Sequence, residues 1–202
     1  LVFKGTKKRK AYHILSRLED VGGEINAYTT KEDTCIFSAF LRQDYERAIE
    51  LIHDICFHSV FPEKEVSREK GVVLDEILSY NDSPSELIFD EFEDLVFKDH
   101  SIGRNILGNE TSVLKFTQND IHRFILQNYS THEMVLSSVG NISFNKLVAY
   151  CEKYFGQVEE RTRIRSRMKP DTYFPEFKTV RKNTHQSHCI VGNIAFDAQD
   201  ER

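Results

Sequence analysis

Two glutamates in one helix-like run are the residues of this sequence best placed to do chemistry. Glu69 and Glu76 are seven residues apart. At about 100° per residue, seven steps turn a helix by roughly 700°, so the two carboxylates project within about 20° of each other. Val72 and Val73 lie between them. Because a carboxylate among apolar groups needs a counter-charge, a proton or a metal ion, we look first for a cation at this face.

The amino-acid composition limits the classes of partner that this chain is expected to bind. The 202 residues are 40% hydrophobic and carry a formal charge of −5, which is too small and too mixed in sign for a typical nucleic-acid-binding protein. No apolar stretch approaches the roughly 18 residues of a membrane span. We therefore expect neither a nucleic-acid nor a membrane partner. The four cysteines are widely spaced and form no paired motif, which weakly favours a reducing compartment such as the cytoplasm.

Hydrophobic periodicity predicts an α+β fold, with helices packed on one face of a mostly antiparallel sheet. Helices are expected at residues 7–21, 45–57, 62–82, 84–96, 121–128 and 143–154, and strands at 25–29, 34–41, 134–139 and 188–196. Helix N-caps are expected at Ser83, which has Glu86 three residues later, and at Thr117. Residues 100–108 have the pattern of a loop, and residues 157–183 have the pattern of a linker that crosses the surface.

Three segments carry a more specific signal. They read Leu-Val-Phe-Lys-Gly-Thr at 1–6, Gly-Gly-Glu-Ile-Asn-Ala-Tyr-Thr at 22–29 and Arg-Glu-Lys-Gly-Val-Val-Leu-Asp-Glu at 68–76. In this order and at these separations they resemble the pitrilysin/insulinase family of zinc metallopeptidases, which includes the mitochondrial processing peptidases. The likeness extends to about residue 156. Each segment alone is a weak match, whereas the ordered set is specific.

The resemblance implies a zinc site. Family members carry His-x-x-Glu-His on a helix, where two histidines bind zinc and the glutamate polarises a water molecule. That motif is absent from this sequence, and in the family it directly precedes the segment that resembles residues 1–6. Its second histidine would fall one position before Leu1, and residues 1–75 then precede Glu76. The resemblance thus makes Glu76 the distal zinc ligand and Glu69 an acid that supports the catalytic site.

Asn26, Ala27 and Tyr28 resemble the strand that lines the substrate cleft of the family. The N–H and C=O groups of an edge strand can pair with any extended peptide, which gives affinity with little demand on sequence. A second interpretation stays open, because Asn26 and Thr29 also fit ordinary solvent-facing strand positions.

The resemblance also predicts the organisation of the chain. Residues 1–156 would be a partial peptidase N-terminal domain without its first strands and motif helix, 157–184 a linker, and 185–202 the start of a second, similar domain. The parent protein would be a zinc-dependent metalloendopeptidase that hydrolyses peptides or small proteins with a zinc-bound water. Its peptide substrate would be enclosed between this half and a second homologous half or subunit, and this chain alone would be inactive.

Two alternatives remain at this point. A non-catalytic relative, acting as a binding or scaffolding subunit, would share the fold and lack the metal motif. The paired acids Glu69 and Glu76 argue against it, because a site without metal has no physical reason to keep them. An unrelated binding domain of helices and sheet would have to match all three segments by chance.

The missing elements generate a first prediction. Without the opening strands and motif helix of the family, apolar surface and a sheet edge are uncovered, so the 202-residue chain should self-associate. Light scattering at high concentration is expected to give a mass above the 23.6 kDa of one chain. A monomeric mass would contradict this.

Overall fold

The computed structural model describes residues 1–164, 166–170, 173–183 and 185–196. It divides into two compact units, Leu1–Glu69 with Phe116–Ser166, and Lys70–Lys115 with Arg167–Arg202. The predicted organisation into 1–156, a linker at 157–184 and a second domain from 185 stays a prediction. Residues 197–202 of that second domain lie outside the described residues.

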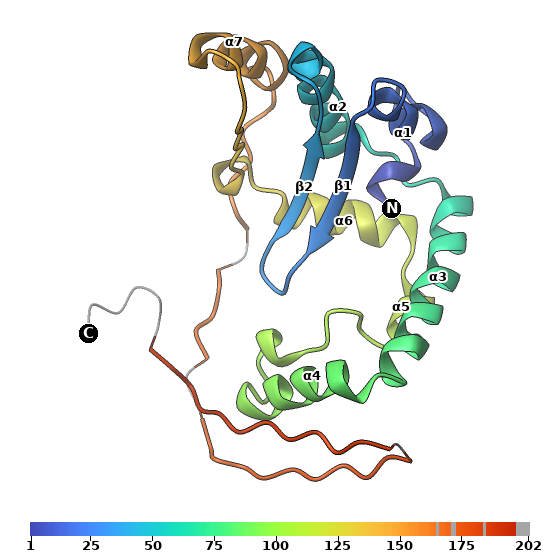
Figure 1. Cartoon of the computed structure of the whole chain (residues 1–202), viewed down its shortest axis with the longest axis vertical. Coiled ribbons are helices and arrows are strands. Elements are labelled where there is room, and N and C mark those ends of the chain that lie inside the picture. Colours follow the sequence, from blue (N-terminus) through green and yellow to red (C-terminus); the bar gives the residue numbers. More distant parts are fainter. Residues whose placement is uncertain (165, 171–172, 184, 197–202) are drawn as a thin grey trace. The chain divides into compact units, whose positions relative to one another are not determined.

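A β-hairpin covered by two helices forms the first unit (Figure 1). Strand β1 (Glu24–Thr29) pairs antiparallel with β2 (Thr34–Ala39), with Ala27 opposite Ile36. Helices α1 (Ala11–Glu19) and α2 (Tyr45–His58) pack on one face of this pair. The buried core consists of Ile14, Leu18, Ala48, Leu51 and Ile55, with Ile25, Ile36 and Phe40 packed against it. The predicted α+β fold, with helices on one face of an antiparallel sheet, is confirmed.

Two further helices complete the first unit. Helix α6 (Gln118–Asn128) begins at the predicted cap, where the Thr117 hydroxyl accepts from the Asp120 N–H and the Asp120 carboxylate accepts from the Thr117 N–H at 2.9 Å. Helix α7 (Phe144–Phe155) packs on α2, and Lys153 and Tyr154 both donate to Glu46 of α2.

Helix α4 (Pro84–Val96) organises the second unit, together with the short helix α5 (Glu110–Lys115). Residues 173–183 contact α4 and the residues that follow it: Lys178 pairs with Glu91, and Glu176 pairs with Lys98 at 2.7 Å. Gly192 contacts the Phe92 ring so closely that a Cβ there would lie 2.6 Å from Phe92 Cζ. Helix α3 (Glu63–Asn81) contributes residues to both units.

Short 3₁₀ turns join these elements, at Val2–Lys4, Arg42–Asp44, Ser101–Gly103 and Thr131–Glu133. None of the helices in the described part of the chain combines the length and hydrophobicity that crossing a membrane requires. All four cysteines lie in the described part of the chain, and all four are free thiols.

Two of the predicted strands were wrong. Residues 134–139 and 188–196 form no strand in the described part of the chain. A segment with a strand-like sequence becomes a strand only when a neighbour pairs with its backbone N–H and C=O groups. No described segment does so here, and Val139 is fully exposed.

Other boundaries also differ from the prediction. The first helix begins at Ala11 rather than residue 7, because residues 5–10 form a turn in which Gly5 is bridged to Lys10 and Arg9 O accepts from the Thr6 N–H. Helix α4 starts at the predicted proline, but Ser83 makes no side-chain cap bond. The helix α5 was not predicted.

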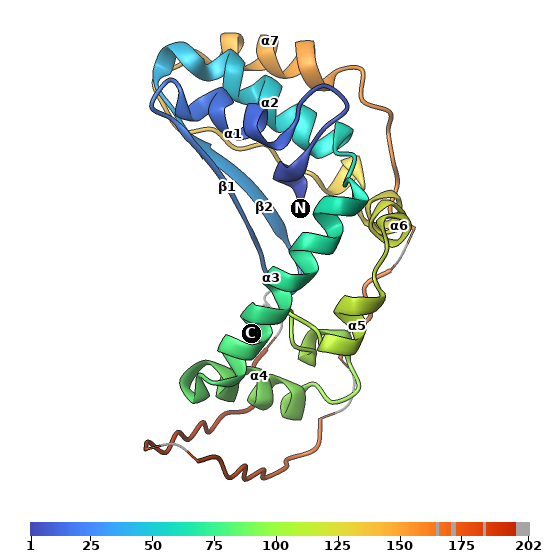
Figure 2. The ribbon, with the colours of Figure 1, turned by 90° about the vertical axis from the view of Figure 1, so that its right-hand side faces the viewer.

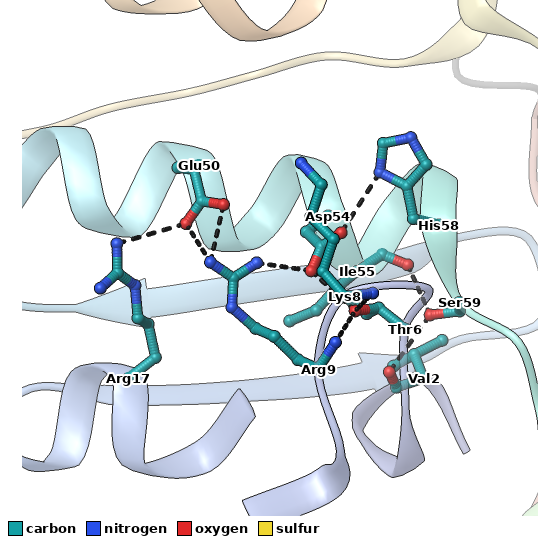
Figure 3. A network of polar contacts seen from close by, with 10 residues as sticks. All are labelled: Val2, Thr6, Lys8, Arg9, Arg17, Glu50, Asp54, Ile55, His58 and Ser59. Atoms are coloured by element: carbon teal, nitrogen blue, oxygen red, sulfur yellow. Dashed lines mark hydrogen bonds and ion pairs between the residues drawn. The ribbon is translucent and has the colours of Figure 1, made fainter. Parts of the chain in front are cut away.

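A buried carboxylate ties the start of the chain to α2 (Figure 3). The Asp54 side chain is 1% exposed, and its Oδ2 accepts from the Thr6 hydroxyl at 2.8 Å and from Arg9 Nη1 at 2.6 Å. Arg9 Nη2 also donates to both oxygens of Glu50 at 2.8 Å. The other Asp54 oxygen, Oδ1, lies 3.3 Å from His58 Nδ1 without hydrogen-bond geometry. The buried charge is therefore compensated mainly through one oxygen.

These contacts shift the pKa of Asp54. Burial raises the pKa of this carboxyl, but the hydrogen bonds from Thr6 and Arg9 outweigh burial and hold the pKa below its ordinary value. Because the folded-state pKa is below the unfolded value of about 3.9, the resulting stabilisation is complete above that pH. It is lost as the pH falls through the folded-state pKa.

We predict that Asp54→Asn lowers the free energy of unfolding at pH 7 by about 3 kcal/mol, because it leaves the partly buried Arg9 with one charged partner fewer. Urea titrations of both proteins should show this difference shrinking at acidic pH, where the wild-type carboxyl is protonated too. The control Glu46→Gln breaks an exposed pair on the same helix and should leave stability nearly unchanged. Equal effects of the two variants would contradict the assignment.

Candidate functional site

The connection between α2 and α3 fixes where the acids of α3 begin. Phe61 adopts a left-handed conformation (φ 47°), which costs energy for a bulky residue, yet its side chain is buried and its ring lies against His122. Gln118 donates to Val60 O at 2.9 Å, and the Val60 N–H donates to Gly5 O at 3.1 Å. The first turns of α3 are thereby held beside the N-terminal segment.

Glu69 is the acid that the structure brings to the start of the chain. Its Oε1 lies 2.9 Å from Lys4 Nζ, and its Oε2 lies 3.9 Å from the Leu1 backbone nitrogen. Figure 2 shows this end of the chain beside α3. Lys4 belongs to the 3₁₀ turn Val2–Lys4, in which the Lys4 N–H donates to Leu1 O. The expected cation at Glu69 is therefore a lysine of this chain.

Glu76 lies on the same helix and differs in its surroundings. Its side chain is exposed, and Val72 beside it is 58% exposed. The desolvation argument from the sequence was therefore wrong for Glu76, because water solvates this carboxylate. Among the described residues it has no hydrogen bond or ion pair, which leaves both oxygens available to a ligand.

The side chains present could supply only part of the ligand set of a zinc site. A free carboxylate such as Glu76 is an accepted zinc ligand, and zinc in proteins takes three or four side chains. No group of three His, Cys, Asp or Glu residues that could hold a metal occurs among the described residues. Of the two acids, Glu76 is the one whose carboxylate has no partner among the described residues, while Glu69 is already paired with Lys4.

The predicted substrate residues lie on an open strand edge. In the described residues β1 has only β2 as a neighbour. The Thr30 N–H donates to Asp33 O, and since bonded positions alternate along an antiparallel pair, the backbone groups of Ala27 point away from β2. The Asn26 side chain covers this edge, because its Oδ1 accepts from the Ala27 N–H at 2.8 Å. Tyr28 is 55% exposed and stands beside Phe37 on the adjacent strand.

Comparison with known proteins decides the family. A family profile described as Insulinase (Peptidase family M16) matches residues 1–110, more than half of the chain. The chain belongs to the insulinase family, peptidase family M16. A second profile, described as Peptidase M16 inactive domain, matches residues 115–202. The resemblance inferred from the three sequence segments is confirmed.

Relatives in the insulinase family are longer than this chain. An uncharacterized zinc protease of Bacillus subtilis, YmxG, is 32% identical over 202 residues, which are 100% of this chain and 49% of that protein. The mitochondrial-processing peptidase subunit beta of Saccharomyces cerevisiae is 34% identical over 158 residues, 78% of this chain and 34% of that protein. The chain spans about half the length, or less, of these curated relatives.

Solved structures show the same fold. A protease from Helicobacter pylori superposes with a TM-score of 0.75 at 22% identity, covering 85% of this chain and 41% of that one. The first half of the periplasmic protease PqqL from Escherichia coli gives 0.73 at 18% identity, covering 83% and 37%. The M16 fold predicted from the sequence is thus confirmed for most of the chain.

Sequence reasoning missed the contact partners of Glu69 and of Asp54. Lys4 lies in the matched segment 1–6, and its signal was a cation close to the expected histidine. Asp54 carried a clearer signal, since it occupies a core-facing position between Leu51 and Ile55 of α2. An acid on the apolar face of a helix requires a partner, but the sequence does not say that Arg9 and Thr6 supply it.

The strand edge yields a prediction. In Asn26→Ala the Ala27 amide loses its acceptor, so its hydrogen exchange should speed up about fivefold, the factor that corresponds to a hydrogen bond worth about 1 kcal/mol. The Tyr28 amide, which faces β2, should be unaffected, as should both amides in the control Thr29→Ala. Exchange at Ala27 that does not change in Asn26→Ala, measured by NMR, would show that this N–H is not held by Asn26.

Proposed function

We propose that the protein to which this chain belongs is a zinc-dependent metalloendopeptidase in which Glu76 is the distal metal ligand and Glu69 supports the site. The two histidines and the general base would come from residues that precede Leu1. When bound, zinc would supply an activated water and a Lewis acid that stabilises the developing oxyanion. The isolated chain, with one ligand of three, would be inactive.

The observation that carries this proposal is the position of the Leu1 backbone nitrogen, 3.9 Å from Glu69 Oε2. A residue bonded to that nitrogen has its Cα about 2.4 Å away. The proposed second histidine would therefore enter the structure beside the carboxylate of Glu69. Glu76 follows two helical turns later on the same helix, with its carboxylate exposed and without a partner among the described residues.

Peptides or small proteins are the substrate class that the geometry supports. The outward N–H and C=O of Ala27 on β1 can pair with an extended chain of any sequence. Asn26 would have to release the Ala27 N–H for that pairing, and its own amide could then bond the incoming backbone. Tyr28 would lie next to a side chain of the docked peptide.

A second homologous half or subunit would complete the enclosure of the substrate. One solved M16 relative is described as the first half of a protease, and the curated relatives are about twice as long as this chain. The contacts that set cleavage specificity would come in part from that second half.

A non-catalytic binding or scaffolding subunit is the competing function. The position of the Leu1 nitrogen beside Glu69 favours the peptidase, because the proposed second histidine would then lie next to this carboxylate. The residues that precede Leu1 in the longer protein decide between them: an intact His-x-x-Glu-His supports the peptidase, and its loss supports the subunit.

The proposal predicts a zinc dependence that can be measured directly. Calorimetry should find no tight zinc site in the 202-residue chain, and one site per molecule in the protein extended by its natural preceding residues. In that longer protein Glu76→Gln should weaken zinc binding by about 100-fold or more and abolish peptide hydrolysis.

Asp75→Asn is the matched control, because it removes an equally exposed neighbouring acid from a different face of α3. It should keep both zinc binding and hydrolysis. Tight zinc binding by the 202-residue chain, or unchanged binding in Glu76→Gln, would refute the assignment of the ligand.

A further inference from the structure

Lys4 makes the closest contact with Glu69 in the described structure. Its Nζ lies 2.9 Å from Oε1, while Oε2 of the same carboxylate lies 3.9 Å from Leu1 N. One oxygen thus faces Lys4, the last residue of the turn Val2–Lys4, and the other faces Leu1, which precedes the turn. Both side chains are partly covered, with 36% of Lys4 and 22% of Glu69 exposed.

Other contacts fix the two segments that this ion pair joins. The N-terminal segment is held to α2 through Thr6 and Asp54, and through the backbone bridge between Thr6 and Ser59. The first turns of α3 are held by the buried Phe61 and by Gln118. Both backbones are therefore anchored by contacts other than this ion pair.

We propose that Lys4 is a positioning residue for the metal site and acts through Glu69. By occupying Oε1, Lys4 turns Oε2 toward the backbone that enters at Leu1. There Oε2 can accept a hydrogen bond from the histidine that would precede Leu1, and a carboxylate that bonds a zinc-ligating histidine fixes its ring orientation. This inference rests on the proposed function.

A purely structural role for Lys4 makes a different prediction. Partly exposed ion pairs contribute little to stability, so as a structural contact Lys4 would change the melting temperature slightly and leave zinc binding alone. As a positioning residue it would change zinc affinity more than stability. The zinc dissociation constant and the melting temperature of the metal-free protein therefore separate the two roles.

The experiment uses the full-length protein that contains this chain, with Lys4→Met, Lys4→Arg, Glu69→Gln and the double variant Lys4→Met/Glu69→Gln. Zinc dissociation constants are measured by competition with a chelator. Lys4→Met should weaken zinc binding about tenfold, Lys4→Arg should restore most of the affinity, and the double variant should be no weaker than Glu69→Gln. Lys7→Met, an exposed lysine of the same segment, is the control and should behave as the wild type.

Three results would overturn the inference. If Lys4→Met binds zinc as tightly as the wild type, Lys4 has no positioning role. If the losses of zinc affinity in the two single variants add up in the double variant, Lys4 does not act through Glu69. If Lys7→Met loses as much zinc affinity as Lys4→Met, the effect comes from the loss of one positive charge in this segment and not from the contact with Glu69. Absence of zinc binding in the wild-type protein would instead refute the proposed function, and the inference with it, so the two failures are distinguishable.

Discussion

The buried carboxylate of Asp54 is the constraint on which the candidate site depends. An uncompensated charge in the core of α1, α2 and the hairpin would destabilise it strongly, and Thr6 and Arg9 provide the compensation. Both partners come from the first ten residues, so the chain cannot satisfy Asp54 without docking its N-terminal segment on α2. This docking brings the turn Val2–Lys4, and with it Leu1 and Lys4, to Glu69 on α3. A requirement of the core thereby determines the geometry of the site.

The two acids of α3 have different surroundings. Glu69 is partly covered and forms an ion pair with Lys4. Glu76 is exposed to solvent and has no partner among the described residues. Helical periodicity puts both on one face, yet burial and pairing distinguish them, and neither property is visible in their spacing.

The sequence predicted the parts of the fold that depend on local pattern. The hairpin, α2, α3 and the Thr117 cap of α6 were found because periodicity and capping act within a few residues. The strand expected at 134–139 failed because a strand also needs a distant partner, and no described segment provides one. The Asp54 network was missed for a similar reason, since Thr6 and Arg9 lie more than forty residues away along the chain. Glu69, Glu76 and the β1 residues were proposed from family likeness, and their roles stay predictions.

X-ray absorption spectroscopy of the zinc-loaded full-length protein tests the central claim most directly. With Glu76 as ligand, the zinc shell should contain two imidazole nitrogens and carboxylate oxygen at about 2.0–2.2 Å, and Glu76→Gln should remove the carboxylate contribution from the spectrum of any metal that remains bound. A first shell that is identical in the wild type and in Glu76→Gln would show that zinc is held without this residue.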